Sequence, residues 1–254
     1  MQKKILFRLA LAAVALTLAA GIATAEAAQT IKIQAAPNGV NYLTDASGMT
    51  LYYYTKDTSG QSVCYGGCAT AWPIFYADTV SVPSGLAASD FGTITRTDNT
   101  KQTTYKGWPL YYWQKDKQSG DMTGEGVGKV WYVLKVPAYT VMVATNAAHG
   151  NYLVDGNGAT LYWFTKDSVG QSACSGDCIK AWPAFTASSL VVPSALNPAD
   201  FGTIARADGI TQETYKGYPL YYWVKDVKRG DTTGQDVGKV WYVIDPAKFP
   251  PAKM

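Results

Sequence analysis

The four cysteines of the chain form two pairs with three residues between their members, Cys64/Cys68 and Cys174/Cys178. Thiols at this spacing could close a disulfide, bind copper or take part in thiol redox chemistry. A copper site of that kind also needs a histidine, and the chain has one, His149, while redox motifs usually read C-x-x-C. Residues four apart on a helical turn have Cα atoms about 6 Å apart, within reach of a disulfide. The sequence therefore predicts two local disulfides, Cys64–Cys68 and Cys174–Cys178, with copper binding or thiol redox chemistry as the alternative.

Aromatic side chains recur in the pattern Tyr-x-aromatic-x-x-Asp at four places in the chain. On a β-strand, residues i and i+2 share a face, so both aromatic side chains of a segment lie side by side and the aspartate follows at the strand end. Packing of each pair on the sheet, with the aspartate bonded to turn N–H groups, explains the pattern best. If exposed, the same pairs would stack on a sugar ring or another flat ligand. The candidate residues are Tyr52, Tyr54 and Asp57; Tyr111, Trp113 and Asp116; Tyr162, Phe164 and Asp167; and Tyr221, Trp223 and Asp226.

Carboxylates could supply a different chemistry, because clustered oxygen ligands bind calcium. The candidates do not follow the spacing of a calcium loop, so the sequence favours solvated loop acids over a metal site. No G-x-S-x-G, H-E-x-x-H or phosphate-binding loop motif occurs. We therefore expect no catalytic residue, no metal site and no cofactor. The acids in question are Asp116, Asp121 and Glu125 in the first half, and Asp226, Asp231 and Asp236 in the second, where Gln235 stands at the place of Glu125.

These residues are carried by an internal duplication. With residue 30 laid on residue 140, the chain aligns with itself without a gap: both cysteine pairs match, Trp72-Pro73 meets Trp182-Pro183, and 128–133 meets 238–243. The sequence predicts module 1 at residues 29–138, module 2 at 139–248 and a tail at 249–254. A weaker symmetry lies inside each module, since 51–57 resembles 110–116 and 161–167 resembles 220–226. Four half-modules are the expected organisation.

The local signals are those of short β-strands. Residues 42–44 and 50–55 flank a tight turn at 45–48, and 93–97 and 101–105 flank a second turn at 98–100. Residues 130–134 and 240–244 are expected to form closing strands. Helical periodicity is confined to short pieces around 68–72 and 86–91, so helical turns are expected beside the cysteine pairs. The predicted class is all-β and predominantly antiparallel, arranged as a sandwich, barrel or propeller.

The N-terminus has the features of a signal peptide. Lys3, Lys4 and Arg8 precede an apolar run over 9–22, and Ala23-Thr24-Ala25 provides a small-x-small cleavage pattern. We expect residues 1–25 to be removed after Ala25, with an uncleaved anchor as the alternative. Removing these three basic residues from the 22 Lys+Arg of the chain leaves 19, against 19 Asp+Glu. A nucleic-acid partner is not expected, because such proteins carry a basic face. No transmembrane segment is expected in the mature chain.

Three motifs of the chain together resemble those of a bacterial family of secreted repeats. They are the aromatic segments, the C-x-x-x-C pairs followed by Ala-Trp-Pro at 71–73 and 181–183, and the Tyr-Lys-Gly-x-Pro-Leu-Tyr runs at 105–111 and 215–221. That family is described as predicted lipoproteins with this motif, without an assigned function. The resemblance covers nearly all of the mature chain and implies an extracytoplasmic repeat protein. Two departures stand out. The chain lacks a lipobox cysteine, and Trp108 and Tyr218 stand where we expect histidine in many relatives.

The sequence therefore predicts an exported, periplasmic or secreted repeat protein that is not an enzyme. It would bind an envelope or extracellular ligand or protein, or serve a structural role, through an aromatic-rich surface. The alternative is a redox or copper accessory protein that uses the cysteine pairs and the dense tyrosines and tryptophans. A hydrolase whose site is assembled only in three dimensions is a third hypothesis, which a pocket with two or more carboxylates would support.

Overall fold

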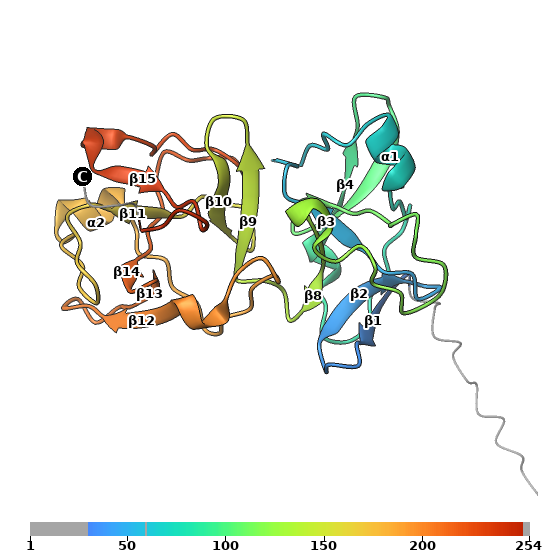
Figure 1. The fold of residues 1–254 in the computed structure, drawn as a ribbon, viewed down its shortest axis with the longest axis horizontal. Coiled ribbons are helices and arrows are strands. Elements are labelled where there is room, and N and C mark those ends of the chain that lie inside the picture. The colour runs from blue at the N-terminus through green and yellow to red at the C-terminus, as the bar shows by residue number, and fades with distance from the viewer. Residues whose placement is uncertain (1–29, 59, 251–254) are drawn as a thin grey trace, which may run out of the picture.

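A computed structural model describes residues 30–58 and 60–250 of the chain. The predicted signal peptide, the first residue of module 1 and residues 251–254 of the tail lie outside the described residues. The described chain folds into two lobes placed side by side, one for each copy of the repeat (Figure 1). Their strands are two to six residues long, antiparallel, and grouped in six small sheets of two or three strands. The all-β class predicted from the sequence is confirmed, and these sheets do not close into a barrel.

Module 1 is built from two hairpins and two short central strands. The first hairpin joins β1 to β2, and the second joins β4 to β5 and then to the two-residue strand β6. The strand β3, which follows the first hairpin in the sequence, pairs with β7, which lies near the C-terminal end of the module. In chain order the elements are β1 (Ile31–Ala35), β2 (Asn41–Asp45), β3 (Tyr52–Tyr54), α1 (Gly67–Ala71), the 3-10 turn η1 (Ala88–Asp90), β4 (Phe91–Thr95), β5 (Lys101–Tyr105), β6 (Trp108–Pro109), the 3-10 turn η2 (Val127–Lys129), β7 (Trp131–Val133) and β8 (Lys135–Val136).

Module 2 repeats this order in the register of the duplication, with one difference. The strand β8, which pairs with β2 in module 1, has no counterpart among the described residues of module 2, where Asp245-Pro246 occupies the place of Lys135-Val136. Proline cannot donate a ladder hydrogen bond. The elements are β9 (Val141–Asn146), β10 (Gly150–Asp155), β11 (Tyr162–Phe164), α2 (Asp177–Ala181), η3 (Pro198–Asp200), β12 (Phe201–Ala205), β13 (Thr211–Tyr215), β14 (Tyr218–Pro219), η4 (Val237–Lys239) and β15 (Trp241–Val243).

Turn residues fix the hairpin registers. Between β5 and β6, Lys106 and Gly107 both have positive φ angles, 47° and 80°. Two consecutive positive φ values are those of a type I′ turn, whose twist matches that of the flanking strands. After β2, the carboxylate of Asp45 accepts hydrogen bonds from the N–H groups of Ser47 (2.8 Å) and Met49 (2.9 Å). The side chain thereby closes the turn that leads into β3.

The helical turns lie beside the cysteine pairs, as predicted, but begin after the first cysteine of each pair. Cys64 precedes α1, and Gly66, with φ 56°, turns the chain between them. The Cα atoms of Cys64 and Cys68 are 5.2 Å apart and those of Cys174 and Cys178 are 5.3 Å apart, and both pairs form disulfides. The local connectivity expected from the repeat is thus confirmed. Within the ranges that the structure describes, no helix has the length and apolarity needed to cross a membrane.

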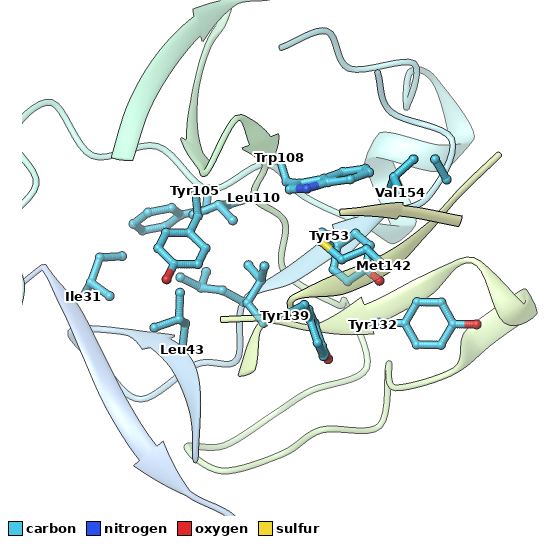
Figure 2. Close-up of a cluster of buried hydrophobic side chains, with 14 of the residues drawn as sticks. Ile31, Leu43, Tyr53, Tyr105, Trp108, Leu110, Tyr132, Tyr139, Met142 and Val154 are labelled. Atoms are coloured by element: carbon cyan, nitrogen blue, oxygen red, sulfur yellow. The ribbon is translucent and has the colours of Figure 1, made fainter. Parts of the chain in front are cut away.

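The strand β9 contributes to the cores of both modules because its two faces are both covered. Val141 and Val143 point into the core of module 2, whereas Met142 and Ala144 pack in a cluster formed mainly by module 1. Figure 2 shows this shared cluster, in which Met142 lies close to Tyr53. Alternation of side chains along a strand puts each set on its own face. The two lobes are therefore joined by an apolar interface as well as by the chain.

We expect Met142→Ala to destabilise the protein by about 2–5 kcal/mol, because it removes a buried side chain from the interface between the modules. Lys32 occupies the matching position of module 1 and is exposed, so Lys32→Ala should change the stability by no more than about 0.5 kcal/mol. Urea unfolding followed by circular dichroism measures both. Equal effects of the two substitutions would contradict the description of β9 as a strand buried on both faces.

Candidate functional site

The tyrosines that open the two aromatic segments of module 1 meet across a local pseudo-two-fold axis. Tyr52 and Tyr111 exchange both backbone hydrogen bonds, with N–H to carbonyl distances of 2.9 and 3.0 Å. The closing strands follow the same symmetry, because Tyr52 also pairs with Val133 and Tyr111 with Ile74. Each half-module thus pairs its tyrosine with residues of the other half, through β3 and β7 at Tyr52 and through isolated bridges at Tyr111. One constant shift along the sequence relates the halves, since it takes position 52 to 111 and position 74 to 133.

The phenol hydroxyls of these tyrosines are bonded to the aspartates of the opposite segments. Tyr52 donates to Oδ2 of Asp116 at 2.7 Å, and Tyr111 donates to Oδ2 of Asp57 at 2.7 Å. Both tyrosines are fully buried. Burial, together with the adjacent carboxylates, raises the pKa of Tyr52 and of Tyr111 well above the usual value. Both hydroxyls therefore act as hydrogen-bond donors and not as ionised nucleophiles.

Module 2 contains the same exchange. Tyr162 donates to Asp226 at 2.6 Å and Tyr221 donates to Asp167 at 2.8 Å. The two tyrosines also pair through their backbones, at 2.8 and 3.0 Å. All four aromatic segments identified in the sequence are thus brought together in two pairs, one pair inside each module.

Each of these aspartates also fixes a turn, as expected from the sequence. The second oxygen of Asp57 accepts the N–H of Val63 at 2.8 Å, and that of Asp116 accepts the N–H and the hydroxyl of Thr123 at 3.0 and 2.6 Å. Burial raises the pKa of Asp57 to about 7, although hydrogen bonds from Tyr111 and Val63 and the charge of Arg96 lower it. Burial likewise raises the pKa of Asp167.

Arg96 is a buried charge beside this network that sequence reasoning missed. Its guanidinium donates to Ser62 Oγ (2.5 Å), Gln102 Oε1 (2.7 Å) and the carbonyl of Cys64 (2.5 Å). Ser62 also lies 2.6 Å from the hydroxyl of Tyr111. Arg206 makes the equivalent bonds in module 2, to Ser172, Gln212 and Cys174. The identity of the two arginines in the repeat register was the signal that could have found them.

The second aromatic residue of each segment belongs to a stack of four rings. In module 1, Tyr54 stacks on Trp131 (4.1 Å between ring centroids), Trp131 on Trp72 (3.9 Å) and Trp72 on Trp113 (4.1 Å). Tyr52 meets the edge of Trp72 and Tyr111 the edge of Trp131. The same shift that relates the two tyrosines takes Trp72 to Trp131, so the two central tryptophans come from different halves. Lys115 caps the outer end, 5.6 Å from the ring of Trp113.

The stack of module 2 differs at one end. Phe164 replaces Tyr54 and stacks on Trp241 at 4.2 Å, followed by Trp182 at 3.9 Å and Trp223 at 4.1 Å. The two central tryptophans of each stack lie outside the predicted site residues, although the repeated Ala-Trp-Pro runs contain Trp72 and Trp182.

A glycine is required where the chain passes the rings. A Cβ atom at Gly124 would come within 2.8 Å of both Tyr52 and Trp72, and one at Gly234 within 2.9 Å of Tyr162 and Trp182. Real Cβ contacts are not that short, so only glycine allows the backbone to lie against the ring edges. The N–H of Gly124 lies 3.2 Å from the hydroxyl of Tyr52.

The loop carboxylates considered for calcium serve the backbone. Asp121 accepts the N–H groups of Lys117 (2.7 Å) and Gln118 (3.1 Å), and Glu125 accepts the N–H of Val133 (2.7 Å). No group of three or more His, Cys, Asp or Glu side chains suited to a metal occurs in residues 30–58 and 60–250. Asp116 is buried and hydrogen-bonded, whereas the sequence favoured a solvated loop acid there.

An open groove lies on module 2, away from the buried stacks. It has a volume of about 890 Å³, and four aromatic side chains line it: Trp163, Tyr218, Tyr242 and Phe249. Trp163 is the centre of this set, with its ring 5.9 Å from Tyr218, 6.3 Å from Tyr242 and 5.2 Å from Phe249. Asp167, Gln235 and the ion pair between Lys248 and Asp245 (2.8 Å) add polar groups. We refer to these four aromatic residues and the space between them as the module 2 groove.

The counterpart of this groove on module 1 is covered. At the matching positions of the first repeat, Tyr53 contacts Trp108 (5.2 Å), Tyr132 (5.9 Å) and Tyr139 (6.0 Å) in the same arrangement. Figure 2 shows these residues with Met142 and Val154 of module 2. We refer to Tyr53, Trp108, Tyr132 and Tyr139 as the module 1 face. Neither set was singled out as a site by the sequence analysis.

Comparison with known proteins identifies one family. A family described as a secreted repeat of unknown function matches four stretches of the chain, residues 41–75, 92–135, 143–186 and 202–245. Each stretch corresponds to one half-module and includes one of the four aromatic segments. No curated protein and no solved structure matches the chain.

We expect Asp57→Asn to reduce the loss of stability between pH 4 and pH 8. An acid with a raised pKa in the folded state favours folding below its unfolded pKa, and that contribution is lost as the pH rises through about 7. The wild-type protein should therefore lose on the order of 2–4 kcal/mol more than the variant over this range. Urea titrations at a series of pH values measure the difference. Asp78→Asn, at an exposed position, is the control, and parallel profiles for wild type and Asp57→Asn would refute the assignment.

Proposed function

Because the chain belongs to the family of secreted repeats of unknown function, we propose that it is an exported, non-enzymatic protein that binds a partner at the cell envelope through the module 2 groove. The single observation that carries this proposal is the contrast between the two modules. One aromatic face is covered by the neighbouring module, and the equivalent face is open. Large open aromatic surfaces on soluble proteins commonly mark interaction sites.

The size and lining of the groove support a binding role. Ligand-binding clefts are typically about 300–1,000 Å³, mostly apolar, with a few polar groups that set orientation. Tyrosine and tryptophan present a flat apolar face with a polar edge, which suits both rings and polypeptide segments. The groove therefore differs from the binding surface predicted from the sequence, which consisted of the aromatic pairs of the four segments, because the opening tyrosines of these segments are buried.

The use of the carboxylates supports a non-enzymatic role. Asp57, Asp116, Asp167 and Asp226 each bind a tyrosine hydroxyl and a backbone N–H, so their oxygens are already engaged by groups that hold the fold together. The tyrosines are the partners in these bonds and lie inside the protein. Such groups stabilise structure, and Asp167, which also lines the groove, has both oxygens engaged in this way.

One expectation and one observation support export. The first is the signal peptide expected at residues 1–25, with cleavage after Ala25. The second is the pair of disulfides, Cys64–Cys68 and Cys174–Cys178, since disulfides persist in the periplasm and outside the cell. The periplasm and the cell exterior both fit these features.

The ring stacks favour a second candidate function, the transfer of single electrons. Tyr54, Trp131, Trp72 and Trp113 form a continuous path at 3.9–4.1 Å between centroids. Tyr54 and Trp113 at its ends are partly exposed. A one-electron oxidant at Trp113 would be reduced while an electron leaves Tyr54 and its phenol proton passes to water. The cysteines are in disulfides, so this candidate rests on the aromatic side chains and not on thiols.

We expect the mature protein to co-sediment with envelope preparations of the producing bacterium and Val169→Lys to remain largely in the supernatant. Val169 lines the groove and is 66 % exposed, so a lysine there adds a charge to the groove without disturbing the core. Val227 is 81 % exposed and does not line the groove, and Val227→Lys is therefore the matched control. Quantified pelleting assays give the bound fraction. Loss of sedimentation in both variants, or in neither, would argue against the groove.

The electron-transfer candidate predicts a tyrosyl radical on Tyr54 after photo-oxidation with a ruthenium(III) complex. Trp72→Leu interrupts the stack of module 1, so the tyrosyl signal in electron paramagnetic resonance should fall several-fold. Trp182→Leu interrupts the stack that ends in Phe164 and should leave the signal in place. Equal radical yields in the two variants would eliminate this candidate.

A further inference from the structure

The module 2 groove repeats the module 1 face residue by residue. In the repeat register, Trp163, Tyr218, Tyr242 and Phe249 stand at the positions of Tyr53, Trp108, Tyr132 and Tyr139. The central ring contacts the other three in both sets. The occupant of the module 1 face is therefore a template for the occupant of the groove. This inference rests on the function proposed above and identifies the kind of partner.

The module 1 face is occupied by the β9–β10 hairpin. Met142, Ala144 and Val154 project from the outer side of this hairpin into the shared cluster. In Figure 1 the hairpin forms the side of the module 2 lobe that faces module 1. Small and flexible apolar side chains fit between the aromatic rings, where a β-strand can approach closely.

A backbone hydrogen bond anchors the hairpin. The N–H of Thr145 donates to the carbonyl of Thr55 at 2.7 Å, and the hydroxyls of the two threonines share a hydrogen bond of 2.9 Å. Apolar contacts and main-chain bonds together are the pattern of strand addition to an exposed edge.

The groove presents the same anchor, for which the described residues provide no partner. Thr165 stands at the place of Thr55, and its N–H bonds to Val240 as that of Thr55 bonds to Val130. Within the described residues, neither its carbonyl nor its hydroxyl takes part in a hydrogen bond, although those of Thr55 do. The groove thus offers the ring set and the acceptor that bind a hairpin on module 1.

A second copy of this chain does not present a free matching hairpin, because its β9–β10 hairpin covers its own module 1 face. Its β1–β2 hairpin carries Lys32, Gln34 and Ala35 where β9 carries Met142, Ala144 and Thr145. Lys32 is exposed, and burying an unpaired ammonium among aromatic rings is costly. Polar outer positions are typical of a terminal repeat, which ends an array.

We propose that the module 2 groove binds the opening β-hairpin of another secreted-repeat protein. That hairpin would carry apolar side chains at two alternate positions of its first strand, followed directly by threonine. The threonine N–H would donate to the carbonyl of Thr165, and the apolar side chains would pack on Trp163 and Tyr218. The chain would then act as a coupling unit that adds one further repeat by the geometry it uses internally.

The experiment uses the full mature chain and a cyclised, fluorescently labelled peptide of residues 140–156 as the probe. We expect saturable binding in fluorescence anisotropy. A control peptide with Met142→Lys, Ala144→Gln and Thr145→Ala reproduces the module 1 hairpin at these positions and should bind at least tenfold more weakly. Equal affinity for the two peptides, or no saturable binding of the first, would overturn the proposal.

Protein variants locate the binding. Val169→Lys should weaken binding of the probe at least tenfold, whereas Val227→Lys should bind as the wild type does. Light scattering tests self-association: a concentration-dependent dimer that Val169→Lys abolishes would make a second copy the occupant and overturn the proposal. If envelope sedimentation depends on Val169 but the probe does not bind, the proposed function stands and the hairpin partner is wrong. If neither depends on Val169, both fail.

Discussion

The structure depends on the need to satisfy buried tyrosine hydroxyls and buried carboxylates together. Tyr52 and Tyr111 pair at a local two-fold axis, and the hydroxyl of each donates to the aspartate of the other segment. A buried polar group without a partner costs about 1–3 kcal/mol, and a buried charge costs more. Each half-module therefore lacks a required partner when it is alone. The family repeat matches one half, whereas the smallest unit with satisfied hydrogen bonds contains two.

The same axis produces the ring stacks. It brings Trp72 from one half and Trp131 from the other into contact at 3.9 Å, and Tyr54 and Trp113 extend the stack at its ends. Aromatic pairs add about 0.5–1.5 kcal/mol each beyond the burial of area. In a module with only short strands and little helix, stacked aromatic side chains thereby form much of a core cluster. The local disulfide and Arg96 hold the adjoining loop against it through the carbonyl of Cys64.

Duplication of the module then gives two copies of one aromatic face in different environments. On module 1 the face is part of the interior, because β9 supplies apolar side chains on its outer side. On module 2 the face forms a groove, partly lined by the chain that follows β15. Aromatic residues at equivalent positions thus serve packing in one place, whereas in the other Trp163, Tyr218 and Tyr242 are partly exposed and Phe249 is buried. The difference is one of position in the array and not of side-chain chemistry.

Much of the architecture follows from the sequence alone. Residue types at fixed spacing predict the period of the duplication, the four aromatic segments, the hairpin turns and the local disulfides. These features depend on contacts between near neighbours or on repetition. The sequence also identified Asp57 and Asp116 as turn-forming residues, which they are. Asp57 follows β3 as expected, whereas the segment of Asp116 forms only isolated bridges at Tyr111 and no strand. The strand limits differed by a residue or two, for example at β4, which begins at Phe91 because Phe91 pairs with Tyr105.

The tertiary structure alone decided which residues meet. Nothing local indicates that Tyr52 bonds to the distant Asp116 instead of to Asp57 in its own segment. Arg96 and the tryptophan partners were missed for the same reason, since their contacts join segments far apart in the chain. Whether an aromatic residue is buried or exposed also depends on what covers it. Tyr53 and Trp163 occupy equivalent positions, but module 2 covers the first, chiefly through the β9–β10 hairpin, whereas the second lines an open groove.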